Sequence, residues 1–152
     1  MTKTLEDLAA TMAQIDFCQL VTKTEGGAVA SRPMSNNGEV DYDGDSYFFT
    51  WDSSRMAADI RADPRVGLTM QGSAGVMGVV GAPPPMLMVQ GKASLVHDRE
   101  RFAKHWNPDL KRWFEQGIDT PGMVMIHVRA ERIAYWDGED QGEVIVGPAS
   151  AA

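Results

Sequence analysis

The chain has 152 residues, of which 43% are hydrophobic and 23% are charged, and its formal net charge is −7. This length predicts one domain over residues 1–152, and the composition is typical of a soluble globular protein. The negative charge argues against a nucleic-acid-binding protein, because a phosphate backbone requires a basic surface. A small anionic ligand is still compatible with it, since such a ligand needs only a few well-placed donors.

The N-terminal residues and the cysteine content predict a cytoplasmic protein. Glu6 and Asp7 interrupt the region where a signal peptide would have its apolar core, and no run approaches the ~18 apolar residues of a membrane span. The single cysteine, Cys18, cannot form an intramolecular disulfide. Its apolar neighbours predict a small buried side chain, not a reactive thiol.

The N-terminal half predicts a helix, a hairpin and a third strand, followed by a short helix. Apolar residues recur at helical spacing over 5–15, with a capping-box pattern formed by Thr4 and Asp7. Strands are expected at 17–23, 28–35 and 46–51. Asp52 or Ser53 is expected to cap the short helix, which ends at about residue 62 ahead of a proline.

The C-terminal half predicts further strands and two short helices. Asn107 and Pro108 have the chemistry of a helix cap and a first-turn proline, and Gly117 that of a helix end. The expected elements are strands at 65–71, 86–97 and 122–138, helices at 99–106 and 107–117, and a Gly/Pro-rich surface loop at 72–86.

Short strands that are joined mostly by hairpins and interrupted by small helices predict a mainly β fold. The expected architecture is an antiparallel barrel with helices covering its openings. The sequence contains neither a GxGxxG motif nor a P-loop, and no nucleophile elbow indicates a hydrolase. His97, His105 and His127 are too far apart in sequence to form a metal-binding motif.

Arg32 and the stretch 53–55 form a candidate phosphate site. The planar guanidinium binds two phosphate oxygens at once, and serines ahead of a helix add hydroxyl groups, free N–H groups and the positive end of the helix dipole. Two interpretations stay open. Either these groups converge on one phosphate, or Arg32 pairs with an acid such as Asp41 or Asp43 while Ser53 only caps the helix.

Pro33 and the segment 47–50 predict accessible backbone groups. Proline cannot donate to a central ladder, so its strand is expected at a sheet edge or a bulge. Backbone amide and carbonyl groups beside Thr50 would suit a flat heteroaromatic ring. An ordinary β-core explains the same aromatic residues equally well.

Three parts of the sequence carry a resemblance to a known family. They are SRPM followed by YFFTWDSSRMAADIRADPRVGL, then VQGKASLVHDRERFAKHWNPDLKRWFEQG, and finally MVMIHVRAERIAYWDG. In this order and spacing they resemble the general stress protein 26 family of the FMN-binding split-barrel superfamily, which includes the pyridoxamine 5'-phosphate oxidases. The resemblance spans about residues 5–140. It implies a six-stranded antiparallel split barrel and a homodimer with two FMN sites at the subunit interface.

On the phosphate side, the resemblance assigns two arginines and the turn before the short helix. Arg32 matches the first phosphate-side arginine, and Ser54 and Arg55, which follow Ser53, match the Ser-Arg of the phosphate turn. The next position, commonly lysine in the superfamily, is Met56 here. Loss of that cation is expected to weaken phosphate binding by about 1–3 kcal/mol, unless the methionine simply belongs to the core.

On the ring side, the resemblance assigns residues of two strands. Met34, next to Pro33, falls where the strand backbone runs along the isoalloxazine ring. Phe49 and Thr50 match the aromatic–threonine step that meets the polar edge of the ring.

Trp106 and Trp113 belong to an apolar set with Phe102 and Leu110, spaced 4, 4 and 3 residues apart. This spacing favours packing in the core. The resemblance offers a second interpretation, in which either tryptophan contacts a partner subunit near the flavin.

The resemblance implies a flavin-dependent oxidoreductase with an unknown small-molecule substrate. Such an enzyme needs no acid–base pair of its own, because the cofactor carries the electrons. The sequence lacks the C-terminal Arg-x-His pattern that the pyridoxamine 5'-phosphate oxidases use for their substrate, which argues against that activity. Two alternatives stay open: a non-catalytic module that stores flavin or senses stress, and a pocket that holds a different anionic heterocycle.

Overall fold

The computed structural model describes residues 2–36, 42–72 and 83–147. Most of the loop expected at 72–86 lies outside these residues. The strands are β1 (Phe17–Lys23), β2 (Val29–Ser35), β3 (Asp45–Trp51), β4 (Arg65–Gln71), β5 (Met86–Val96), β6 (Met123–Asp137) and β7 (Asp140–Ile145). The helices are α1 (Leu5–Met12), α2 (Arg55–Ala62) and α4 (Arg99–His105), with 3₁₀ helices η1 (Pro108–Arg112) and η2 (Gly117–Asp119).

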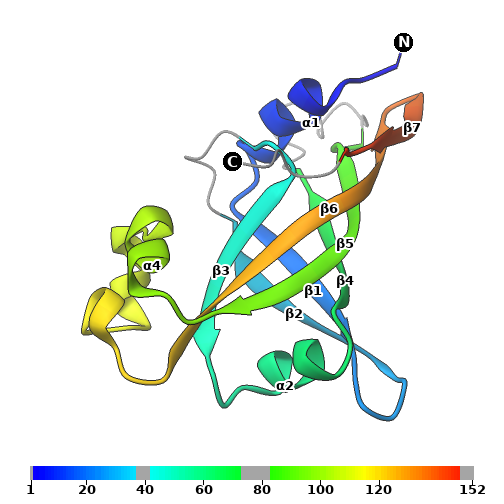
Figure 1. Cartoon of the computed structure of the whole chain (residues 1–152). Coiled ribbons are helices and arrows are strands. Elements are labelled where there is room, and N and C mark those ends of the chain that lie inside the picture. Colours follow the sequence, from blue (N-terminus) through cyan, green and yellow to red (C-terminus); the bar gives the residue numbers. More distant parts are fainter. Residues whose placement is uncertain (1, 37–41, 73–82, 148–152) are drawn as a thin grey trace.

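One antiparallel sheet forms the barrel (Figure 1). Its strands follow the order β2-β1-β4-β5-β6-β3, and β7 pairs with β6 off this path. The predicted mainly β, antiparallel fold with short helices is therefore confirmed, but the described sheet has seven strands, not six. None of the described helices is both long and apolar enough to cross a membrane.

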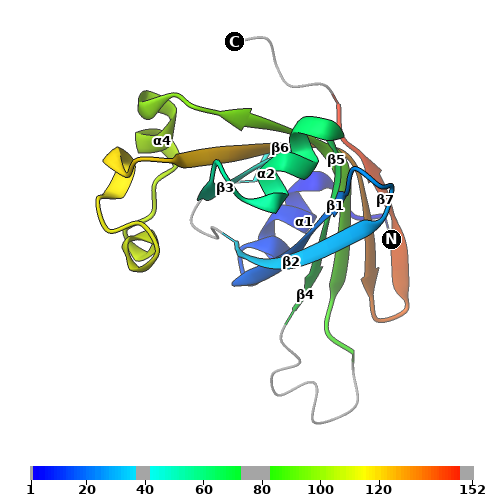
Figure 2. The ribbon, with the colours of Figure 1, turned by 90° about the horizontal axis from the view of Figure 1, so that it is seen from below.

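The helices α1 and α2 cover opposite openings of the barrel (Figures 1 and 2). The predicted capping box starts α1: the Thr4 side chain accepts from the N–H of Asp7, whose carboxylate accepts from the N–H of Thr4. The helix ends at Met12 instead of residue 15. The cap of α2 is Ser54, whose Oγ accepts from the N–H of Ala57, so the expected caps Asp52 and Ser53 are wrong.

Two expectations for the C-terminal half are wrong. The chain does not end its strands at residue 138 but turns at Gly138, where φ is 66°, and returns as β7 beside β6. Because Asp137 pairs with Asp140, the two turn residues are Gly138 and Glu139, and glycine at the first of two turn positions is a hairpin signal. The helix expected at 107–117 is only the 3₁₀ helix η1, which ends at Arg112, and Gly117, with φ at 63°, begins η2 instead of ending a helix.

Two apolar clusters stabilise the fold. The first fills the barrel and includes fully buried residues such as Leu20, Leu68 and Ile133. The second packs α4 and the 3₁₀ helices against the outer side of β3 and β6; its buried members are Phe49, Val96, Phe102, Phe114, Met123 and Met125. Cys18 belongs to the first cluster, and burial raises its pKa to about 12, as expected of an unreactive thiol.

A bulge in β6 brings two backbones unusually close. Gln90 of β5 pairs with Arg132 and Gly91 pairs with Ala130, so Glu131 is an extra residue in β6. A Cβ atom added to Gly91 would lie 2.3 Å from the carbonyl oxygen of Arg129. Only glycine fits this position without a backbone shift.

The substitution Gly91→Ala is expected to lower the free energy of unfolding by about 2–3 kcal/mol, because the strand pair must separate to admit the methyl group. Gly26→Ala is the matched control, since its added Cβ meets nothing within 4 Å. The control should stay within about 0.5 kcal/mol of the unsubstituted protein. Urea unfolding measures both, and equal stability of the two variants would contradict the close approach at Gly91.

Candidate functional site

A cleft of about 810 Å³ lies between β2 and β3. These strands occupy the two ends of the strand order, and within the described residues β2 pairs only with β1 and β3 only with β6. The predicted edge position of Pro33 is thus confirmed. The volume falls in the range of roughly 300–1,000 Å³ that small-molecule sites occupy. We call this feature the β2–β3 cleft.

The β2–β3 cleft brings together sequence-predicted residues from three separate segments. They are Pro33, Met34, Phe49, Thr50 and Trp113. Residues 47–51 of β3 all border the cleft, although alternate side chains of a strand point to opposite faces. The edge of β3 itself therefore forms the cleft wall, which leaves backbone N–H and C=O groups available to a ligand.

The candidate phosphate residues lie beyond the lining of the β2–β3 cleft. The cleft borders Pro33, the neighbour of Arg32, and Met56, the neighbour of Arg55, but neither arginine. Ser53 and Ser54 also lie outside it. Met56 is 7% exposed and packs in the barrel core, so it has the core role that its helical spacing indicated and also borders the cleft.

Arg32 has an acidic partner, but that partner is Asp59 of α2. Its Nη2 lies 3.4 Å from Asp59 Oδ2, and its Nη1 donates to Thr22 Oγ1 at 2.8 Å. The expected pairing with Asp43 is wrong, and Asp41 lies outside the described residues. Asp59 follows Arg55 by about one helical turn, so the contact places Arg32 against the middle of α2.

Asp59 is a site residue that the sequence interpretation missed. It is 8% exposed and lies on the buried side of α2 with Met56 and Ile60. A carboxylate on the apolar face of a predicted helix is the signal for a buried ion pair, since an unpaired buried charge is costly. That signal indicates that a cationic side chain lies nearby, but it does not identify which one.

The two tryptophans occupy different environments. Trp106 packs edge-on against Phe49, with ring centroids 5.3 Å apart, and near Phe114 at 6.4 Å, which supports the packing interpretation for this residue. Trp113 is 52% exposed and borders the β2–β3 cleft. Phe114, not Trp113, is the buried residue. The chain leaves helical geometry after α4 and then forms the tighter turns of η1, so the spacing of an α-helix no longer predicts which side chain points inward.

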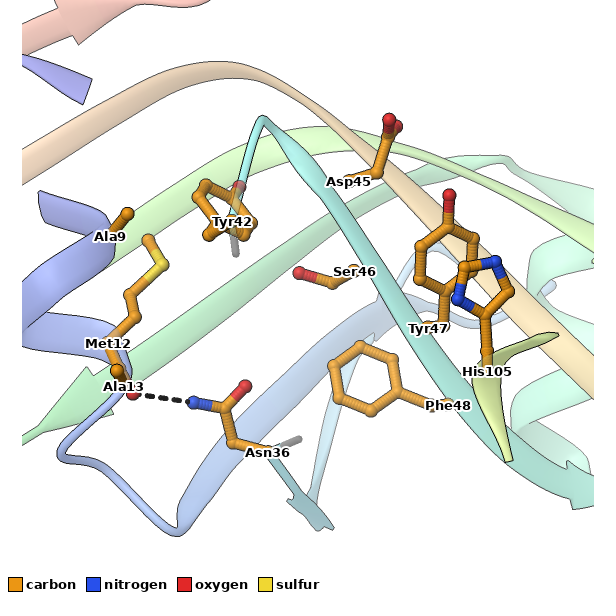
Figure 3. A pocket seen from close by; sticks show the side chains of 10 residues that line it. All are labelled: Ala9, Met12, Ala13, Asn36, Tyr42, Asp45, Ser46, Tyr47, Phe48 and His105. Carbon is orange, nitrogen blue, oxygen red and sulfur yellow. Dashed lines mark hydrogen bonds between the residues drawn. The ribbon is translucent and has the colours of Figure 1, made fainter. Parts of the chain in front are cut away.

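Tyr47 lies between two histidines on the outer side of β3. Its ring stacks on His105 with centroids 3.4 Å apart and on His127 at 4.9 Å, and His127 Nε2 is 2.7 Å from Asp45 Oδ1. Figure 3 shows the rings of Tyr47 and His105 side by side at the edge of a small cavity of about 30 Å³. That cavity is far smaller than the roughly 300–1,000 Å³ that small-molecule sites occupy, so it does not fit a cofactor.

The family of the chain follows from its sequence as a whole. Residues 3–151 match the family model described as "Pyridoxamine 5'-phosphate oxidase like". The chain belongs to this family. Protein bli-3 of Neurospora crassa is 27% identical over 140 residues, which cover 86% of the present chain and 63% of that relative. The chain thus spans less than two thirds of the length of this curated family relative.

Solved structures share the fold. One is a protein from Clostridium acetobutylicum related to general stress protein 26 of B. subtilis, in the pyridoxinephosphate oxidase family, with a TM-score of 0.74, 17% identity and 92% of each chain covered. Another is a pyridoxamine 5'-phosphate oxidase-related, FMN-binding protein from Nostoc punctiforme, with a TM-score of 0.69, 12% identity, and 97% of this chain and 100% of that chain covered. The family match confirms the resemblance to the pyridoxamine 5'-phosphate oxidases, and these structures confirm the fold that it implied.

Burial at the Tyr47 stack lowers the pKa of His105, and the nearby positive charges of Lys104 and Arg101 lower it further. Because the pKa is lower in the folded state than in the unfolded chain, where it is about 6.5, the unfolded chain binds more protons as the pH falls through this range. Protonation of His105 therefore favours unfolding.

The substitution His105→Phe is expected to make stability less dependent on pH between about 7.5 and 5.5, since it keeps a stacking ring but removes the titrating group. Urea unfolding at several pH values compares the variant with the unsubstituted protein. The same loss of stability on acidification in both proteins would show that His105 is not responsible.

Proposed function

We propose that this protein binds FMN in the β2–β3 cleft and acts as an FMN-dependent oxidoreductase of the general stress protein 26 type. The observation that carries the proposal is that Met34 from one sheet edge and Phe49 and Thr50 from the other line the same cleft. The family match and the FMN-binding relative from Nostoc punctiforme support the same ligand.

The β2–β3 cleft fits the ring part of FMN. The edge of β3, which has no second strand partner among the described residues, offers amide and carbonyl groups to the polar edge of a flavin ring. Met34 and Trp113 add apolar surface, which suits the faces of an aromatic system. Small-molecule sites commonly combine an apolar lining with a few backbone donors and acceptors in this way.

The start of α2 fits the phosphate part. Ser54 Oγ is occupied by the N–H of Ala57, but the backbone N–H groups of Arg55 and Met56 have no acceptor within the part of the chain that the structure describes. Such first-turn N–H groups bind phosphate together with the helix dipole. Arg32 contacts the same helix one turn further along, through Asp59, and adds a second guanidinium on this side of the barrel opening.

In this function the chain binds and orients, and bound FMN supplies the electron-accepting ring. The β3 edge holds the polar side of the ring, and the arginines hold the phosphate. Phe49 and Trp106 pack edge to face behind β3 and exclude water from that side. We assign no pyridoxamine 5'-phosphate oxidase activity, because the Arg-x-His pattern for that substrate is missing from the sequence.

We also propose a homodimer with FMN at the subunit interface. Three large apolar residues that border the β2–β3 cleft are exposed: Phe17 at 63%, Trp51 at 42% and Trp113 at 52%. A group of exposed aromatic residues around a cleft is typical of a surface that another molecule covers. A second copy of the chain would cover these rings and close the open side of the cleft over the flavin.

The main alternative is a non-catalytic module that binds flavin for storage or for sensing stress. Met56 supports this alternative, because methionine in place of lysine removes a cation from the part of the β2–β3 cleft next to α2. Both functions require flavin binding and differ only in turnover. Bleaching of the bound flavin by NADH or NADPH, followed by reoxidation in air, indicates the oxidoreductase, and lack of bleaching indicates the module.

FMN titration of the apoprotein tests the proposal. We expect the mixture to keep the visible absorbance of flavin after dialysis, and we expect Arg32→Ala and Arg55→Ala each to weaken binding about tenfold or more, because each removes charged donors from the phosphate. Arg99→Ala is the control, since Arg99 pairs with Asp119 in a different, exposed part of the molecule. A colourless product after dialysis, or unchanged affinity in both arginine variants, would contradict the assignment.

The substitution Met56→Lys is expected to tighten FMN binding about tenfold, because the lysine stem can follow the path of Met56 and place its ammonium group at the cleft. Met56→Leu is the matched control and should leave the affinity unchanged. Isothermal calorimetry measures all three proteins. If the lysine variant folds and binds no more tightly, Met56 serves only as a core residue and the phosphate lies elsewhere.

A further inference from the structure

A largely buried hydrogen-bond network holds Arg32, the neighbour of the cleft residue Pro33. Thr22 is 1% exposed, and its hydroxyl donates to Asp59 Oδ2 at 2.7 Å while it accepts from Arg32 Nη1 at 2.8 Å. The carbonyl oxygen of Leu20 accepts a second bond from Nη1 at 3.3 Å. Arg32 Nη2 lies 3.4 Å from Asp59 Oδ2. The network joins β1, β2 and α2, which are three separate elements.

The network uses one particular edge of the guanidinium group. Thr22 Oγ1 and Asp59 Oδ2 are hydrogen-bonded to each other, so they lie side by side and take the edge between Nη1 and Nη2. The bond to Leu20 uses the other hydrogen of Nη1. A guanidinium has five N–H donors in a fixed fork, so Nε–H and the outer hydrogen of Nη2 are left. Among the described residues, neither has an acceptor.

The two remaining donors have the geometry that a phosphate needs. Nε–H and the outer Nη2–H are parallel, and this edge of arginine binds two oxygens of one phosphate. The Arg32 side chain is 23% exposed, so the group is not sealed within the protein. A ligand that reaches the Nε/Nη2 edge can therefore bind it while the other edge stays attached to Thr22 and Asp59.

We propose that Thr22 and Asp59 are positioning residues: they orient the Arg32 guanidinium so that it can bind the phosphate of the ligand. The inference rests on the function proposed above. The hydroxyl of Thr22 acts in two directions at once: it gives its proton to Asp59 and accepts from Arg32, which sets the rotation of the guanidinium plane. Without it, the long arginine side chain samples other rotamers, and the phosphate loses a preorganised partner.

A purely structural role of the same network makes a different prediction. If the network only ties β2 to α2, loss of the hydroxyl lowers stability but does not distinguish between ligands with and without a phosphate. FMN and riboflavin differ only in that group. The ratio of their two affinities therefore separates orientation of Arg32 from general stabilisation of the fold.

The test compares Thr22→Val, which has almost the same shape without the hydroxyl, with Thr22→Ser, which keeps the hydroxyl. Each variant is titrated with FMN and with riboflavin by fluorescence. We expect the valine variant to bind FMN about tenfold more weakly and riboflavin within twofold of the unsubstituted protein, and the serine variant to retain the preference for FMN. Thr69→Val of β4, which the structure does not connect to Arg32, is the matched control and should change neither affinity.

Each other outcome is informative. If the unsubstituted protein binds neither flavin, the proposed function fails. If it prefers FMN and the valine variant keeps that preference, only the role of Thr22 fails. Equal weakening of both ligands would show a structural role alone and would also overturn the inference. Riboflavin binding reports whether the variant is folded, and Thr22→Ala removes the same hydroxyl with less bulk if the valine variant does not fold.

Discussion

The pairing of β6 with three other strands decides where this sheet stops. Its first half pairs with β3 and its second half with β7, while β5 runs along both halves on the other side. β3 is therefore attached by one edge only, and its second edge faces β2 across an open space. The β2–β3 cleft exists because these two edges do not meet. The bulge at Glu131 lies where β6 passes from one partner to the other, between the residues that pair with β3 and those that pair with β7.

The open edges divide the candidate site into two chemical parts. The edges of β2 and β3 provide backbone groups and apolar surface, which suit a neutral, planar ring. The positive charge lies at α2, where Arg55 starts the helix and Arg32 contacts Asp59. The protein carries a net charge of −7, so an anionic ligand would depend on these local donors and not on a generally basic surface. Asp59 partly neutralises Arg32 but also holds it in place, because a buried carboxylate needs its cation.

Local chemistry predicted much of the fold. Thr4 with Asp7 identified the start of α1, and the missing N–H of Pro33 identified an edge strand before any pairing was known. These predictions hold because each depends on a few neighbouring atoms. The N-cap of α2 was misplaced by one or two residues, since Asp52, Ser53 and Ser54 have similar capping chemistry. The strand β7 was missed although Gly138, the first of two turn residues, is a typical hairpin signal.

The sequence by itself determined the family and the mainly β architecture, because hydrophobic period, turn chemistry and motif order are properties of the chain. Only the tertiary structure decided which groups meet across space. In the folded protein, Asp59 pairs with Arg32, and Tyr47 lies between His105 and His127. Phe114 is buried, whereas Trp113 is exposed. These outcomes depend on how far the sheet curls and where it ends. Contacts between distant segments set both, and no local pattern in the sequence records them.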